Sequence, residues 1–474
     1  MQIGNRFRCY PIKQQAEVLL QWIGAQRFTY NAKVSEDRYF RRFALKSLSH
    51  TGEYAPIDQT YSQFKTDELS PWMKQIPSQI LRNGAVKWKQ GYDRFFAKLA
   101  GRPTIHTKHG KQSVWLTSEL FQFTKTETGY ELQLGTKTKQ LGVLAFKAHK
   151  PYQLPATIHI SIHAGRWFVS FNYDDQQIEP KTEDTIAWLQ QFSESELAQI
   201  TVGIDRGVAI HLALSNGVCF GFSDVQKKRL VEQERKKKRW QKIQARRVQG
   251  SRNQKKAKYK VARYARYAGN VRQDMAHKAS RIMVDMPDKK LFVFESLKLK
   301  NMTKKPKAKQ DAQGHWLSNG AKAKAGLNKA LLASALGITK IFTSYKAKRA
   351  GKLVIEVPTF YTSQECSQCG HIHPDNRVTQ DTFICQSCGH SENADINAGK
   401  VIAKRGIHKL LSDKSLVKKK KQVKKLGKTK VGQEMSEPIQ VTVSTLGESV
   451  LDAQGQCLSV LYSVNQETPT STVG

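Results

Sequence analysis

Four cysteines, arranged as two Cys-x-x-Cys-Gly pairs, place the tightest constraint on how the C-terminal part of this chain can fold. Fifteen residues separate the two pairs, and the remaining cysteines stand alone among apolar neighbours. Thiols at this spacing in a reducing environment are typical of a structural zinc site, in which the protein fills all four tetrahedral positions. We predict a zinc ribbon with Cys366, Cys369, Cys385 and Cys388 as ligands. Nearby His371, His373 and His390 are alternative ligands, although such histidines are more often exposed loop residues.

A closed zinc site performs no chemistry, so the acidic residue just beyond it is of more interest. Asp395 begins an apolar helical segment, while Asp205 and Glu295 each end a short apolar run that is typical of a buried strand. The ends of neighbouring strands are where α/β sheets place their ligands. Each acid taken alone is more simply a turn, cap or helix-dipole residue. The occurrence of all three acids next to apolar elements instead favours a single shared metal site.

Three carboxylates in one place repel each other unless a cation neutralises them. Two Mg²⁺ ions ~3.5–4 Å apart would do so, and they would also activate water and stabilise the leaving oxygen of a phosphodiester. We therefore predict that Asp205, Glu295 and Asp395 are catalytic and bind Mg²⁺. The order strand, hairpin, helices, strand, helix, strand, helix matches the layout of an RNase H-like core.

The charge of the chain indicates a polyanionic partner. Lys and Arg number 78 against 39 Asp and Glu, a formal net charge of +39. The basic residues form dense helical blocks interleaved with aromatics, which favours nucleic acid over merely solvated charged faces. The longest apolar runs are too short to cross a bilayer, and the polar, basic start does not resemble a signal peptide. We expect a cytoplasmic protein with no membrane partner.

Changes in hydrophobic periodicity predict the domain organisation. After Pro11, apolar residues recur at helical spacing and predict a long first helix. A second helix is expected from Ser78 to about Ala100. Period-two patterns follow from Ser113. We also expect two basic helices, at roughly Val225–Val248 and Asn253–Met286, a mobile loop at Asn301–Ala325 and a helix at Lys329–Arg349. We predict a first barrel strand at 1–10, a helical insertion at 11–104, the rest of a small β-barrel or sandwich at 105–180, a linker with one short helix at 181–199, an α/β core at 200–358, the ribbon at 359–392, a last core segment at 393–407, and a basic then polar, disordered tail at 408–474.

One continuous stretch runs from Tyr361-Thr362-Ser363-Gln364 through the cysteine pairs to Asp395-x-Asn397-Ala398. This stretch resembles the most specific motif of the TnpB family, the OrfB proteins of insertion sequences. Val202-Gly203-Ile204-Asp205, Phe294-Glu295-x-Leu297 and Asn270-x-Arg272-x-Asp274-x-x-His277-Lys278 add support, and Arg27-Phe28-x-Tyr30-Asn31 is a looser match. The resemblance covers roughly residues 1–405.

The resemblance implies a multidomain α/β plus all-β protein. It would contain a RuvC-like core with a zinc ribbon insertion and a wedge β-barrel with a helical recognition insertion. It also implies cleavage of double-stranded DNA that pairs with a guide RNA beside a short motif read by the protein. A monomer is favoured. The expected nucleic-acid-binding residues are Arg27, Tyr30, Asn31, Lys236, Lys237, Lys238, Arg239, Arg272 and Lys278.

Three alternatives remain open. Compact type V CRISPR effectors share the same core and ribbon, although the short start of this chain favours the transposon protein. A guided DNA-binding regulator that does not cut is disfavoured by the intact acids. A transposase that joins strands ranks last, since no Tyr or Ser nucleophile stands in place for a covalent DNA intermediate.

Overall fold

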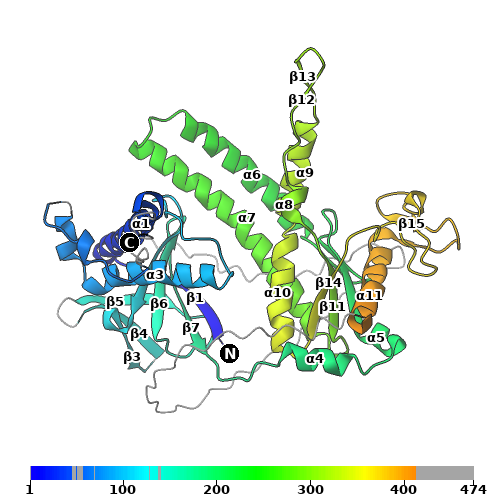
Figure 1. The fold of residues 1–474 in the computed structure, drawn as a ribbon, viewed down its shortest axis with the longest axis horizontal. Coiled ribbons are helices and arrows are strands. Elements are labelled where there is room, and N and C mark those ends of the chain that lie inside the picture. The colour runs from blue at the N-terminus through cyan, green and yellow to red at the C-terminus, as the bar shows by residue number, and fades with distance from the viewer. Residues whose placement is uncertain are drawn as a thin grey trace, which may run out of the picture. The chain divides into compact units, whose positions relative to one another are not determined.

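The computed structural model describes residues 2–44, 50, 57–68, 70–127, 129–136 and 140–412. The chain divides into two compact units, Met1–Ile178 and Glu179–Gly474 (Figure 1). Most of the tail predicted at 408–474 lies outside the described residues. Its first residues belong to the last helix, which continues to Ser412.

Unit 1 is built on a seven-stranded antiparallel sheet in the order β2-β6-β7-β1-β5-β4-β3. The first strand therefore lies in the middle of the sheet, although two long helices separate it from the other strands in sequence. Hairpin β6–β7 turns at Ala164 and Gly165, which both have positive φ. The strands are β1 (Gln2–Tyr10), β2 (Gln112–Thr117), β3 (Phe121–Thr126), β4 (Gly129–Gly135), β5 (Gln140–Lys147), β6 (Thr157–His163) and β7 (Arg166–Asp174).

This sheet is strongly curled around one apolar core. Phe123 of β3 and Phe171 of β7 have ring centroids 6.2 Å apart, although three strands lie between β3 and β7 in the sheet. Alternate residues point inward, as in Trp167, Val169 and Phe171. No ladder joins the end strands β2 and β3 within the described residues, so the hydrogen-bonded order is open.

Helices α1 (Lys13–Tyr39) and α3 (Ser78–Phe96) pack against this core. Their close approach depends on Gly84, because a Cβ there would lie 2.6 Å from the Gln26 carbonyl oxygen. The second helix was predicted to run to about Ala100. It ends at Phe96 instead, because Lys98 adopts a positive φ of 59° that breaks the helix.

Unit 2 contains a five-stranded sheet in the order β10-β9-β8-β11-β14. Strands β8 (Thr201–Asp205), β11 (Leu291–Glu295) and β14 (Leu353–Val357) run parallel. Strands β9 (Leu212–Leu214) and β10 (Cys219–Phe220) form the predicted hairpin, with Gly217 at a φ of 85° in the turn. The predicted order of strand, hairpin, helices, strand, helix, strand, helix is found, with an additional small hairpin and further helices between β11 and β14.

The two faces of this sheet are covered by different helices. Even-numbered strand residues such as Ile204 and Phe294 pack against α7 (Arg252–Asp285) and α10 (Leu336–Arg349). Odd-numbered residues such as Val293 and Ile355 pack against α11 (Ala394–Ser412). Helix α6 (Asp224–Ala245), begun by a Ser223 capping box, lies beside α7 as a long helical hairpin (Figure 1).

Three predictions about unit 2 were wrong. The segment 181–199 is not a linker with one helix, because α4 (Thr182–Leu189) and α5 (Glu194–Ile200) bury apolar side chains against β11 and β14. The loop expected at 301–325 contains α8 (Leu299–Met302), the hairpin of β12 (Lys309–Gln310) and β13 (Trp316–Leu317), and the start of α9. The helix predicted at 329–349 is two helices, since Ala335 has a φ of 57° between α9 (Ala321–Ala333) and α10.

Candidate active site and metal centre

Two of the three predicted acids lie level with each other at the carboxyl ends of neighbouring parallel strands. Ile204 of β8 pairs with Phe294 of β11, so Asp205 and Glu295 occupy the next position on each strand. Because side chains alternate, both acids share the sheet face that packs on α11. Asp395 stands in the first turn of that helix.

Glycines set the distance between α11 and this sheet. A Cβ on Gly203 would clash with the Gly399 carbonyl oxygen and lie 2.6 Å from the Ala403 nitrogen. Asp205 lies two strand residues beyond Gly203, ~6.6 Å, and Asp395 lies four helix residues before Gly399, ~6 Å. Since α11 runs opposite to β8, these two steps bring both acids to the same height.

Replacing Gly203 by Ala is therefore expected to destabilise unit 2 by about 3 kcal/mol, because backbone must move to admit the methyl group. It should also displace Asp395 from Asp205 and so lower any activity of the site. Thermal denaturation checks the first effect. Gly269→Ala in α7 is the matched control, since a Cβ there meets nothing within 4 Å. Equal melting temperatures for the two variants would contradict the packing argument.

Asp205 is affected electrostatically by both of the other acids. Burial, with the nearby carboxylates of Glu295 and Asp395, raises the pKa of Asp205 to about 7. Burial also raises the pKa of Glu295 and of Asp395, against the opposing effects of neighbouring hydrogen-bond donors and guanidinium groups. At Asp205, repulsion from two carboxylates adds to the effect of burial, so a bound cation would stabilise its charged form.

Three partners of these acids were not predicted. Buried Arg206 donates to the carbonyl oxygens of Glu295 and Leu336 and so ties the end of β11 to α10. The Thr362 hydroxyl donates to the Glu295 carboxylate. Arg206 directly follows Asp205, and Thr362 lies in the Tyr361–Gln364 motif. Both partners could therefore have been predicted from their place in the sequence.

Nothing in the sequence around Arg377 indicated a contact with the acids. Its guanidinium lies 2.9 Å from Asp395 Oδ1, and only the fold of the ribbon brings the two residues together. The main-chain N–H groups of Asp395 and Ile396 donate to Asn393 Oδ1 at 3.0 and 3.2 Å. The helix start that carries Asp395 is thus held by a side-chain cap.

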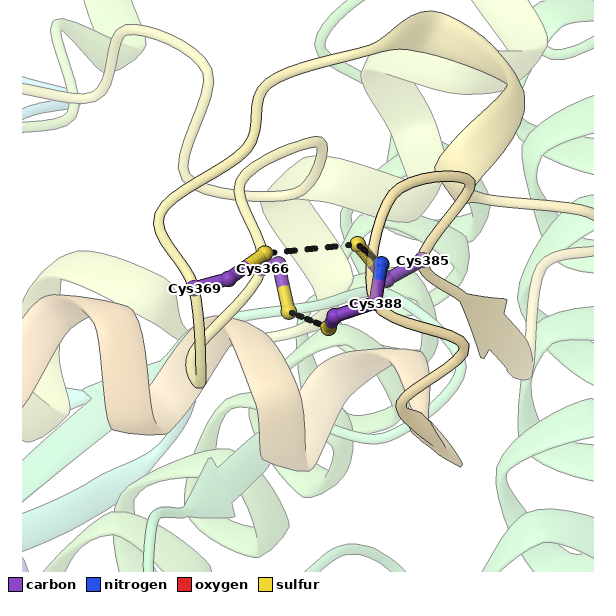
Figure 2. Close-up of side chains that lie close together, drawn as sticks. All are labelled: Cys366, Cys369, Cys385 and Cys388. Carbon is purple, nitrogen blue, oxygen red and sulfur yellow. Dashed lines mark hydrogen bonds between the residues drawn. The ribbon is translucent and has the colours of Figure 1, made fainter.

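The four predicted cysteines come together, as Figure 2 shows. All four Sγ atoms lie within 4.8 Å of one another, with Cys366–Cys388 at 3.7 Å and Cys369–Cys385 at 3.6 Å. Tetrahedral thiolates ~2.3 Å from zinc would be about 3.8 Å apart. The cluster therefore fits one zinc ion. None of the histidines considered as alternative ligands joins it in the described part of the chain.

Buried asparagines attach this cluster to the rest of the site. Asn376 donates to the carbonyl oxygens of Gln364 and His371 and accepts from the Gln386 N–H, so it links the two cysteine pairs. Asn397 of α11 accepts from Ser367 N–H at 2.9 Å and donates to Glu365 O at 2.8 Å. The ribbon is thereby fixed to the helix that carries Asp395.

The carboxylates form a wider arrangement than the thiols. Among the described residues, only the four cysteines bring three or more His, Cys, Asp or Glu ligand atoms within 4.8 Å of one another. The acids are therefore too widely spaced to surround a single ion. A pair of ions ~3.5–4 Å apart spans a larger site. Carboxylate oxygens suit Mg²⁺, which completes its coordination with water and substrate oxygens.

The predicted nucleic-acid residues lie in three places. Lys236, Lys237, Lys238 and Arg239 belong to α6, which buries no side chain, and Arg272 and Lys278 belong to α7. Several of these cations pair with acids on their own helix, including Lys278 with Asp274 at 3.0 Å. Cation–π contacts of Lys260 with Trp240 and Arg229 with Tyr267 link the two helices.

The N-terminal group is divided between structural and accessible positions. Tyr30 is buried and stacks on His106, with ring centroids 4.0 Å apart. Asn31 makes both amide hydrogen bonds with the His106 backbone. These two side chains hold the loop that precedes β2, whereas Arg27 is partly exposed and donates to Gln112.

No helix in the described ranges is long and apolar enough to span a bilayer.

Comparisons with known families match three separate parts of the chain. Residues 176–305 match the OrfB "probable transposase" model of IS605-type elements, and residues 339–402 match the Cas12f1-like TNB domain. Residues 1–38 match a model described as a helix-turn-helix domain of the same OrfB proteins. In the structure this last segment is strand β1 followed by the single long helix α1.

Individual relatives are similar to this chain over very different lengths. A protein of Escherichia coli (strain K12), called putative RNA-guided DNA endonuclease InsQ, is 27% identical over 92% of this chain and 98% of its own length. The CRISPR-associated endodeoxyribonuclease Cas12f1 of Sulfoacidibacillus thermotolerans is 46% identical over only 15% of this chain and 16% of its own. Among solved structures, a Cas12f1–sgRNA–target DNA complex contains a chain with a TM-score of 0.46 and 12% identity, covering 85% of this chain and 98% of that chain.

The family models follow one another along the chain, and the InsQ match is nearly end to end. The motifs that carried the resemblance in the sequence fall within the same matched segments. In these separate segments, and in one nearly end-to-end relative, the chain is similar to the OrfB proteins of IS605-type insertion sequences.

Proposed function

We propose that this protein is an RNA-guided DNA endonuclease of a transposable element. The observation that carries the proposal is the position of Asp205 beside Glu295 at the ends of neighbouring strands, where the carboxylates of Glu295 and Asp395 add to burial in raising the pKa of Asp205. A pair of Mg²⁺ ions held there would supply a nucleophilic water and neutralise the charge of the reacting phosphodiester. The sheet order supports assignment of unit 2 to an RNase H-like, RuvC-type core.

The chain's own residues would keep this site in order. Arg206 and Thr362 hold Glu295 in place, while Gly203 and Gly399 set the separation of Asp205 and Asp395. Arg377 reaches Asp395 from the ribbon and places a positive charge at the edge of the carboxylates. A phosphate entering the site would meet this guanidinium, which suits the planar, two-pronged recognition of phosphate oxygens.

We further propose that unit 1 is the wedge barrel with its helical recognition insertion. The position of β1 inside the sheet, with α1 and α3 between β1 and β2 in sequence, supports this assignment. The α6–α7 hairpin, rich in Lys and Arg, would follow the backbone of a guide RNA–target DNA duplex by charge and shape. The protein would act as a monomer in the cytoplasm.

The extent of similarity favours the transposon protein over a CRISPR effector. The InsQ relative matches over nearly its whole length, whereas the Cas12f1 relative matches over a short segment. That segment is of a length similar to the 339–402 match, which covers the ribbon and the start of α11. This core and ribbon are the parts that both groups of nuclease are expected to share.

Purification of the protein with its bound RNA tests the function directly. The RNA is sequenced, and a plasmid library is built that carries its matched target beside randomised bases. We expect Mg²⁺-dependent linear product from the subset of plasmids with one short adjacent motif. Target binding without any scission would support the guided regulator instead, and joined strand products would support the transposase. A protein that binds no RNA would refute the proposal.

A further inference from the structure

Unit 1 contains a partly buried ammonium group, that of Lys87, which no carboxylate of the described residues neutralises. Lys87 of α3 points into the junction with β2, where its Nζ donates to Gln26 Oε1 at 3.1 Å and lies 6.0 Å from the centre of the Trp115 ring. Within the described residues it has no acidic partner. Burial, followed by repulsion from Lys111, lowers the pKa of Lys87 to about 8, so the amine still carries its charge at neutral pH.

Lys33, another lysine of this unit, shows how carboxylates neutralise a buried ammonium group. Lys33 is almost fully buried, and it contacts the carboxylates of Glu36 and Asp58, the latter at 2.9 Å. A charge withdrawn from solvent is normally paired in this way, because burial without a partner disfavours the charged form. Lys87 has no such partner in the described part of the chain, which leaves this position open to an anion supplied by a ligand.

More positive and N–H-donating groups face the same place from separate elements. The pKa of His106 is lowered by burial and then by Lys87 and Arg27, and burial with Lys87 and Lys111 lowers the pKa of His159 to about 4. His159 is the cross-strand neighbour of Trp115, and their rings stack with centroids 6.4 Å apart. Helices α1 and α3, the loop before β2, and strand β6 thus all contribute.

We propose that Lys87, Lys111, Arg27, His106 and His159 form a binding site for a phosphodiester of a nucleic-acid backbone, with the Trp115 ring as one wall. The inference rests on the proposed function only in that the anion belongs to nucleic acid. At neutral pH the site offers three cationic side chains and two imidazoles that can donate N–H. Phosphate is the anion such a set recognises, and the burial of Lys87 strengthens its attraction to that charge.

Removing the charge of Lys87 is expected to stabilise the free protein. Lys87→Met keeps the length of the side chain and removes the uncompensated charge. Gln26 Oε1 stays satisfied, since it also accepts from Trp115 N–H at 2.9 Å. We therefore expect Lys87→Met to raise the melting temperature of the free protein while it weakens binding of nucleic acid, as is common where a functional site is strained.

The test uses the full chain and two labelled probes of one sequence, a 20-nucleotide single-stranded RNA and a 20-base-pair DNA duplex. Binding is measured by fluorescence anisotropy over a series of salt concentrations. For the probe that uses the site, Lys87→Met should lower the affinity about three- to tenfold and reduce the slope of log affinity against log salt by about one. Which probe responds identifies the source of the phosphate.

Two further variants make the outcome decisive. Lys111→Gln alters an exposed side chain and should weaken binding of the same probe without affecting folding. Lys125→Met removes an exposed lysine from β3 and is the control for net charge. The proposal is overturned if Lys87→Met and Lys111→Gln bind both probes like the control, or if Lys87→Met lowers the melting temperature. Should the wild-type chain bind neither probe, the proposed function fails with it.

Discussion

Asp205→Asn is expected to lower the rate of target DNA cleavage at least about 10³-fold, with binding of RNA and of target DNA within about twofold of wild type. The amide keeps the shape of the side chain but cannot serve as an anionic ligand for a divalent ion. Cleavage of a matched plasmid and a gel-shift assay on the same preparations measure the two effects. Binding lost together with cleavage would argue against a purely catalytic role.

The same variant should be more stable than wild type in magnesium-free buffer. The pKa of Asp205 is raised to about 7 from an ordinary value of 3.8, so the folded protein holds this proton more tightly than the unfolded chain. The free energy of unfolding therefore falls as the pH rises from about 4 to 7, and the full penalty is present above pH 7. Asp205→Asn removes the loss of stability that ionisation of this buried acid causes. The variant's gain in melting temperature should therefore be largest above pH 7 and absent near pH 4. A gain that does not depend on pH would contradict this account.

Cys385→Ser is expected to have the second largest effect. Loss of one thiolate from a four-cysteine site weakens zinc binding by orders of magnitude, and that binding contributes directly to folding. Because Asn397 and Arg377 connect the ribbon to Asp395, DNA cleavage should fall along with zinc content. Elemental analysis should give one zinc per wild-type chain and much less in the variant. Cys219→Ser, which alters a thiol of the same unit outside the four-cysteine cluster, should keep both zinc and activity.

If Cys385→Ser retained a full equivalent of zinc, the four-thiol site would be refuted. If it lost zinc but cleaved DNA at the wild-type rate, the connection from ribbon to Asp395 would be refuted instead. The two outcomes separate the metal site from its proposed effect on the carboxylates.

Much of unit 2 was predictable because its elements are local patterns. The apolar runs that end at Asp205 and Glu295 indicate buried strands, since both faces of a parallel strand are covered. The basic blocks indicated helices α6 and α7, and they form close to the predicted bounds. The segment 181–199 was misread as a linker because its polar composition hides the three apolar residues, Ile186, Leu189 and Leu197, that α4 and α5 bury.

By itself the sequence determined the kinds of chemistry available to this protein: four thiols at zinc spacing, three acids next to apolar elements, and a large positive charge. Composition and spacing are enough for such statements, because ligand type and strand pattern are local properties. Only the tertiary structure decided which charges are compensated. It pairs Arg377 with Asp395 and gives Lys33 two carboxylates, whereas Lys87 has none among the residues that the structure describes. Coulomb energies depend on separation and burial in space, and residues as distant along the chain as Lys87 and His159 meet only after the chain has folded.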